Sequence, residues 1–280
     1  MTTTAMTVLG FCIIFIATTA GAALVFFFKG ELSGKLNTLF LGFASGVMVA
    51  ASVWSLLIPS IEGAGETYGA LSFLPAVIGF LLGGAFLVLI DKLVPHFHKG
   101  TNEEEGLKSH LNKSAKLFLA VTIHNIPEGL AVGFAFGAAA ALGEEGAFVS
   151  ALGLAVGMAI QNFPEGAAVS LPMKTATGSR GKAFLYGMGS GAVEPVFAVI
   201  GYFLAANLTA AQPWFLAFAA GAMIFVVVED LIPDAHLSEH PHFGTWGAML
   251  GFAVMMALDV ALGQPKKVFL RFFIFLWKNN

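Results

Sequence analysis

The chain has 280 residues, of which 57% are hydrophobic and 11% charged, and its mean hydropathy is +0.82. A soluble domain carries about 25% charged residues, so this composition excludes an ordinary soluble protein and indicates several membrane crossings. The formal net charge of −3 says little about function, because the distribution of charge along the chain matters more than its sum. No nucleic-acid partner is expected. The single cysteine, Cys12, excludes an intramolecular disulfide and a cluster of thiolate metal ligands.

The apolar segments, in chain order, are long enough to span a bilayer. The first segment lacks a basic n-region and is too long for a signal peptide, so we interpret it as a transmembrane helix. A spanning helix needs about 20 mostly apolar residues. Eight segments meet this requirement: 7–28, 38–60, 71–92, 115–140, 147–173, 183–206, 213–233 and 244–262. We therefore expect an all-α polytopic membrane protein with one transport domain over residues 1–263 and no soluble domain.

The basic residues of the linkers predict the orientation of the chain. Lysine and arginine concentrate in the first, third and fifth linkers: Lys29, Lys35, Lys92, Lys99, Lys108, Lys113, Lys116, Lys174, Arg180 and Lys182. Loops rich in these residues stay on the cytoplasmic side. The polar loop 93–114 is then cytoplasmic, and both termini lie outside. The basic, aromatic tail 264–280 is too short to span the bilayer, and no role is assigned to it.

Two predicted spans carry nearly the same polar motif. The fourth contains HNIPEG and the fifth contains QNFPEG. In each motif the first polar residue and the glutamate are four positions apart, which puts them one turn apart on the same helix face. The prolines, Pro127 and Pro164, each remove a backbone donor, and we expect a kink at both. A carbonyl freed by a kink at membrane depth must be satisfied by protein, water or an ion.

Three carboxylates fall inside predicted spans, namely Glu128, Glu165 and Glu194. Each costs on the order of 2.5–3.5 kcal/mol to insert, and together they repel one another unless a cation or protons lie between them. A divalent cation explains them most simply, although a proton relay would use the same carboxylates. An imidazole, amides and carboxylates suit zinc, manganese or ferrous iron rather than copper(I). Met48 could add a thioether or be an ordinary core residue.

The two motifs HNIPEGLAVG and QNFPEGAAVS resemble the paired signatures of the ZIP (Zrt/Irt-like) metal transporters, and the bacterial GufA-like branch most closely. The resemblance covers residues 5–262. It implies a bundle in which the first three helices are an inverted repeat of the last three, with the motif helices between them. It also implies elevator-type transport of divalent metal into the cytoplasm, in a bacterial inner membrane. Zinc is expected as substrate, with cadmium, iron or manganese as others, and no prosthetic group is expected.

The resemblance also implies which residues bind metal. They are His124, Asn125, Glu128, Gln161, Asn162, Glu165, Glu194 and Met48, and the exit path is expected to use Glu229, Asp230, Asp234 and His236. GufA-like members can hold two metals bridged by the motif glutamates. Asn162 stands where some relatives have aspartate, which puts the second metal position in doubt.

Other polar residues and other functions stay open at this stage. His96, His98 and His110 are either a regulatory metal loop or part of a solvated acidic loop, and Asp259 is a candidate for the outer entrance. A proton-coupled carrier of an organic solute and a passive metal channel are alternatives, since both also use broken helices. The absence of an H-E-x-x-H motif and of a G-x-S-G motif argues against an intramembrane enzyme. The sequence does not decide whether the chain forms a homodimer.

Overall fold

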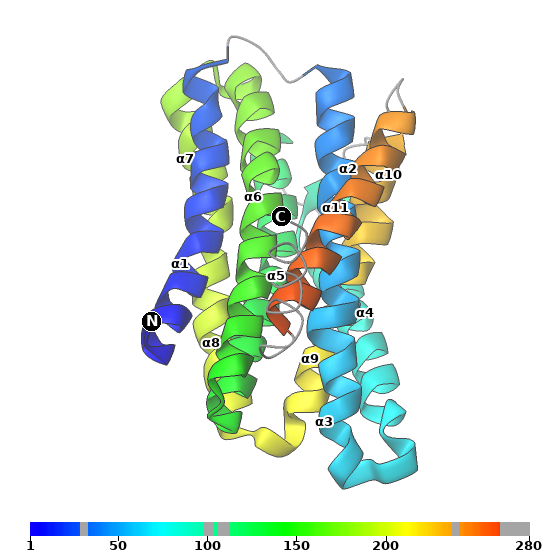
Figure 1. Cartoon of the computed structure of the whole chain (residues 1–280). Coiled ribbons are helices and arrows are strands. Elements are labelled where there is room, and N and C mark those ends of the chain that lie inside the picture. The colour runs from blue at the N-terminus through cyan, green and yellow to red at the C-terminus, as the bar shows by residue number, and fades with distance from the viewer. Residues whose placement is uncertain (29–32, 98–103, 106–112, 237–240, 264–280) are drawn as a thin grey trace, which may run out of the picture.

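The computed structural model describes residues 1–28, 33–97, 104–105, 113–236 and 241–263 (Figure 1). Within these ranges, eight helical segments are long and apolar enough to cross a membrane: Thr3–Phe26, Gly34–Gly65, Gly69–Leu93, Phe118–Leu142, Glu145–Thr177, Arg180–Asn207, Thr209–Ala235 and His242–Leu262. These segments match the eight predicted spans and confirm the all-α prediction. The described strands are two residues each, with β1 (His96–Phe97) antiparallel to β2 (Glu104–Glu105).

Several spans consist of more than one helix. The first span is α1 (Thr3–Ala22) with a 3-10 turn, η1 (Ala23–Phe26), and the second is α2 (Gly34–Ala51), η2 (Ser52–Leu57) and α3 (Ile58–Tyr68). The remaining elements are η3 (Gly69–Leu71), α4 (Phe73–Leu93), α5 (Lys113–Leu142), α6 (Glu145–Thr177), α7 (Arg180–Gly191), α8 (Val193–Asn207), η4 (Thr209–Ala211), α9 (Gln212–Val226), η5 (Val227–Leu231), α10 (Ile232–His236) and α11 (Pro241–Gly263).

The helix pairs follow the pattern of an inverted repeat. The most extensive contacts join α1 to α6, α5 to α8, α2 to α11 and α4 to α9. If the first three spans match the last three and α5 matches α6, then the α1–α6 pair corresponds to the α8–α5 pair. By the same rule, the α2–α11 pair corresponds to the α9–α4 pair. Each of the first three spans and its counterpart are five spans apart, and five is an odd number, so the two copies would cross the membrane in opposite directions, as expected of an inverted repeat.

The same local irregularity occurs in the second and seventh spans. Both η2 and η5 are π-helical, and each leads into an Ile-Pro pair, Ile58–Pro59 and Ile232–Pro233. Proline withholds one backbone donor, and π turns inside α-helices occur frequently at functional sites. By contrast, α5 and α6 are continuous through Pro127 and Pro164, so the helices are not broken there and a bend at these prolines stays a prediction.

Glycines bring α1 and α6 into backbone contact. A Cβ atom at Gly166 would lie 2.0 Å from the Thr18 carbonyl oxygen, and one at Gly21 would lie 1.9 Å from the Phe163 carbonyl oxygen. No side chain fits between the two helices at these points, as is common where membrane helices pack closely. This contact brings Thr18 beside the polar residues of α6.

The two ends of the bundle differ in charge. Helix α1 ends, and α2 and α7 begin, at the top of Figure 1. Because successive spans run in opposite directions, α4 ends and α5 begins at the same end, and the sequence that links these helices contains most of the basic residues named above. We call this end the basic end. The connections between α3 and α4, α5 and α6, and α8 and α9 form the opposite end.

Candidate metal centre

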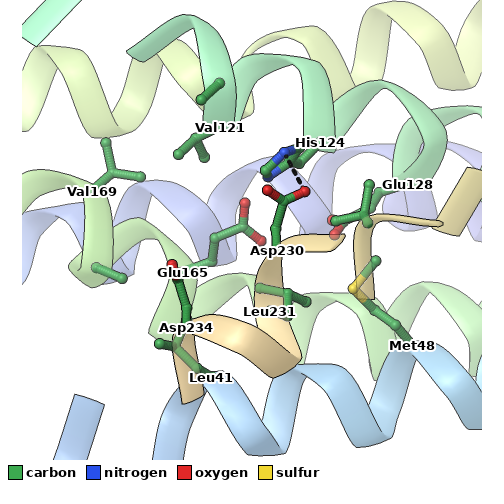
Figure 2. Close-up of a pocket in the computed structure, with 13 residues that line it drawn as sticks. Leu41, Met48, Val121, His124, Glu128, Glu165, Val169, Asp230, Leu231 and Asp234 are labelled. Atoms are coloured by element: carbon green, nitrogen blue, oxygen red, sulfur yellow. Dashed lines mark ion pairs between the residues drawn. The ribbon is translucent and has the colours of Figure 1, made fainter. Parts of the chain in front are cut away.

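A cavity of about 60 Å³ lies between α2, α5, α6 and the η5–α10 segment. Its thirteen lining residues are Leu41, Met48, Ala120, Val121, His124, Glu128, Glu165, Ala168, Val169, Val226, Asp230, Leu231 and Asp234 (Figure 2). Along their helices these residues extend from the middle of the bundle toward the basic end. We call this cavity the inner pocket. Four carboxylates, one imidazole and one thioether line it, and no lysine or arginine is among these thirteen residues.

An ion pair spans the inner pocket. Nε2 of His124 on α5 lies 3.1 Å from Oδ2 of Asp230 on the π segment η5 (Figure 2). Figure 2 also shows the Glu128 and Glu165 side chains reaching into the same pocket from α5 and α6. Residues of both motifs and the two aspartates predicted for the exit path therefore line one pocket.

A second polar cluster lies buried beside the inner pocket and is centred on Glu194 of α8. The Thr18 hydroxyl donates a hydrogen bond to Oε1 of Glu194 at 2.9 Å, and Nδ2 of Asn162 donates to Oε2 at 2.7 Å. Nε2 of Gln161 donates in turn to Oδ1 of Asn162. We call Thr18, Gln161, Asn162 and Glu194 the Glu194 cluster. It joins α1, α6 and α8, so both carboxylate oxygens of Glu194 already have neutral donors.

Three buried oxygens of the motif residues lack a donor. Within the described part of the chain, Oδ1 of Asn125, Oε2 of Glu128 and Oε1 of Gln161 have no hydrogen-bond partner. These residues are at most 2% exposed, and Asn125 is held by a 2.9 Å hydrogen bond from its Nδ2 to the Ser190 carbonyl. A buried polar group without a partner costs about 1–3 kcal/mol. Amide and carboxylate oxygens are metal ligands, so a cation bound nearby would supply the partner that such an oxygen lacks.

Not every predicted site residue lines the inner pocket. His124, Glu128, Glu165, Met48, Asp230 and Asp234 do, whereas Asn125, Gln161, Asn162 and Glu194 are buried but are not among the lining residues. Glu229 is exposed and does not line the pocket. The structure describes the backbone of His236 and His96 but not their side chains, while His98 and His110 lie outside the described residues.

The acidic groups are spread along the inner pocket. Among the described residues, no three histidine, cysteine, aspartate or glutamate side chains are grouped closely enough to hold a metal ion as they stand. A ligand set drawn from these residues therefore needs amide oxygens or side-chain movement.

Two contributors to the site were not predicted from the sequence. Thr18 binds Glu194, and the Ser190 carbonyl orients Asn125. No sequence signal identified Thr18, because a threonine in an apolar helix usually bonds its own backbone. The Thr18 hydroxyl also lies 3.2 Å from the Ile14 carbonyl oxygen, but its single hydrogen is shared with the shorter contact to Glu194.

A second pocket of about 740 Å³ lies toward the opposite end of the bundle. We call it the outer pocket. Its lining includes Ser55, Glu62, Glu144 and Asp259, and Ser55 donates a hydrogen bond to Asp259. Between the lining residues of the two pockets, each of four helices carries a fully buried residue: Ala51, Val132, Met158 and Met223. The four residues belong to one buried hydrophobic cluster, and we call them the apolar layer.

Comparison with known proteins identifies the family. The family model described as ZIP Zinc transporter matches residues 102–259. The chain belongs to the ZIP family. It is 39% identical to zinc transporter ZIP11 of Homo sapiens, with 88% of this chain and 94% of that protein covered. It is also 37% identical to zinc transporter ZIPB of Bordetella bronchiseptica (91% and 81% covered) and 38% identical to zinc transporter GufA of Myxococcus xanthus (83% and 90% covered).

Membership confirms the family predicted from the motifs and agrees with the prediction that this ZIP protein is a membrane transporter rather than an enzyme. The matched segment includes both polar motifs and the π segment η5. The pockets and clusters described above therefore fall largely within the matched segment. The exceptions are the contributions of α1, α2, η2 and α3, which precede the match, and Val260 of the outer pocket, which follows it.

Proposed function

We propose that this protein carries divalent metal cations, zinc foremost, through the membrane into the cytoplasm. The observation that supports this most strongly is the set of buried oxygens without donors on Asn125, Glu128 and Gln161, of which Glu128 lines the inner pocket together with the His124 imidazole. Relatives named zinc transporters support zinc as the substrate. Cadmium, ferrous iron and manganese have compatible ligand preferences.

His124, Glu128, Gln161 and Glu165 are the proposed ligands of one cation. Imidazole nitrogen and carboxylate oxygen are ordinary zinc ligands. Met48 lines the same pocket and would add a thioether, and Asn125 would supply an amide oxygen. Protons compete with metal for such ligands, so binding should weaken in acid.

The site holds a single cation in this proposal. The second metal position would lie beside Asn162 and Glu194. These two residues are instead hydrogen-bonded to each other, with the Asn162 amide N–H pointing at the Glu194 carboxylate. Because an N–H group does not coordinate a cation, Asn162 and Glu194 act in the Glu194 cluster as support for the ligands on α6.

The proposed direction follows from the charge of the linkers. With the basic end in the cytoplasm and both termini outside, the inner pocket reaches toward the cytoplasm and the outer pocket toward the outside. Metal would arrive at the outer pocket near Asp259 and leave past Asp230 and Asp234. The apolar layer then closes the outer route in this conformation.

An elevator-type motion fits the pairing of the helices. One group contains α1, α5, α6, α7 and α8, which carry the motif residues and the Glu194 cluster. The other contains α2–α4 and α9–α11, which carry Met48, Asp230 and Asp259. Movement of the first group against the second would expose the site to each pocket in turn.

Uptake into proteoliposomes loaded with a metal-sensitive dye tests the proposal. Zinc, cadmium, manganese and ferrous iron are compared for the wild type and for Glu128→Ala. We expect metal-dependent uptake that the substitution abolishes. A folded wild type that moves no metal would favour a proton-coupled organic carrier. Uptake that rises linearly without saturation would favour a channel.

A further inference from the structure

Lys116 is a buried cation near the beginning of α5. Its exposed fraction is 3%, and it is the one lysine or arginine that is buried among the residues the structure describes. Lysine is almost never fully buried unless it is paired, and Lys116 does take part in a polar or electrostatic interaction. The Lys116 side chain is therefore withdrawn from solvent.

Lys116 lies on the basic-end side of the metal ligands. It precedes His124 by two helical turns, or about 12 Å at 1.5 Å per residue, and Ala120, one turn after Lys116, lines the inner pocket. On the facing element, Asp234 lies one turn beyond Asp230 in the same direction and also lines the pocket. Lys116 thus lies one helical turn beyond the lining residues of α5, on the side of the basic end.

The inner pocket is lined by negative charges, so a lysine at this position would affect how tightly the pocket binds a cation. The lining has four carboxylates and no lysine or arginine, and a pocket of one charge with apolar walls concentrates ions of the opposite sign. At a separation equal to this rise of about 12 Å, a positive charge weakens the binding of a divalent ion about threefold at low salt in a medium as polar as water, and more in a less polar medium. The effect has the same sign whether Lys116 acts on the ion directly or by neutralising a nearby carboxylate.

We propose that Lys116 sets the affinity of the inner pocket by opposing the bound cation and so promotes its release at the basic end. It does not coordinate the metal. This inference rests on the proposed function, because it assumes that a divalent cation binds at His124, Glu128, Gln161 and Glu165.

Cadmium binding to the purified full-length protein, measured by titration calorimetry, tests the inference. Lys116→Met keeps the length of the side chain and removes its charge, and Lys116→Arg keeps the charge. Lys182→Met is the matched control, since Lys182 is an exposed lysine near the start of α7 at the same end.

At low ionic strength we expect Lys116→Met to bind cadmium about threefold more tightly than the wild type, or more. Lys116→Arg and Lys182→Met should bind cadmium like the wild type. The difference should shrink at 1 M salt, where the screening length falls to about 3 Å.

Unchanged cadmium affinity in monodisperse Lys116→Met would overturn the inference, as would an equal tightening in Lys182→Met. Should Lys116→Met fail to fold, Lys116→Gln carries the same prediction and keeps a polar end group for the buried partner. A wild type that binds no cadmium would instead refute the proposed function. Wild-type binding that is lost in Glu128→Ala and unchanged in both neutral Lys116 variants would refute only the role of Lys116.

Discussion

At the scale of single residues, the Glu194 cluster depends on hydrogen bonds that cross between helices. Thr18 is on α1 and Glu194 on α8, and their 2.9 Å bond is buried. Thr18→Val keeps the shape and removes the donor, so we expect a loss of about 1–2 kcal/mol in the free energy of unfolding, measured by thermal denaturation in detergent. Thr19→Val is the control, since the Thr19 hydroxyl has no partner among the described residues. Equal destabilisation by both variants would contradict a specific role for Thr18.

The residue at position 162 decides, in this account, how many ions the site holds. Asn162→Asp replaces the amide that donates to Glu194 with a carboxylate, and two facing carboxylates repel unless a cation lies between them. We therefore expect bound cadmium to rise from one to two ions per chain, counted by elemental analysis after gel filtration. A count that stays at one would show that the position does not bind metal in this chain.

At the scale of elements, the eight spans were predictable because a run of about 20 mostly apolar residues is typical of a transmembrane helix. The π segments η2 and η5 were not, since Ser52–Leu57 and Val227–Leu231 have the composition of ordinary α-helix. The sequence also did not show which of the two adjacent acidic residues of η5 reaches the site. Adjacent helical residues point in different directions, so Glu229 and Asp230 do not share a face, and only Asp230 reaches the inner pocket.

Close packing between α2 and α11 depends on glycine. A Cβ atom at Gly46 would lie 1.9 Å from the Ala248 carbonyl oxygen, so Gly46→Ala should push the helices apart and cost about 1–3 kcal/mol. Gly63→Ala in α3 is the control. No described atom lies within 4 Å of a Cβ there, and alanine should be neutral or stabilise the helix by up to about 1 kcal/mol. Thermal denaturation of both variants would distinguish the two effects, and a Gly46→Ala variant as stable as the wild type would argue against backbone contact.

At the scale of the whole molecule, the motifs predicted the family, and the three-plus-two-plus-three arrangement followed from the resemblance. The relation between the two pockets was not predictable, because it depends on how the helix pairs sit against each other in one conformation. The sequence placed His124, Glu128 and Glu165 in neighbouring spans, but the contact with Asp230 requires the seventh span to lie against the fourth.

The orientation of the bundle in the membrane can be tested with single cysteines. In a Cys12→Ser background, Ala176→Cys marks the basic end and Leu208→Cys the opposite end, and both positions are exposed. We expect a membrane-impermeant maleimide to label Leu208→Cys in intact cells and Ala176→Cys only after permeabilisation. The opposite pattern would reverse the proposed direction of transport.

The most direct test of the central claim is to locate a bound ion by anomalous diffraction from crystals grown with cadmium. We expect one strong peak in the inner pocket, within coordination distance of the His124 imidazole and the Glu128 and Glu165 carboxylates. Cadmium bound only at the outer pocket near Asp259, or no ordered cadmium between α5 and α6, would contradict it.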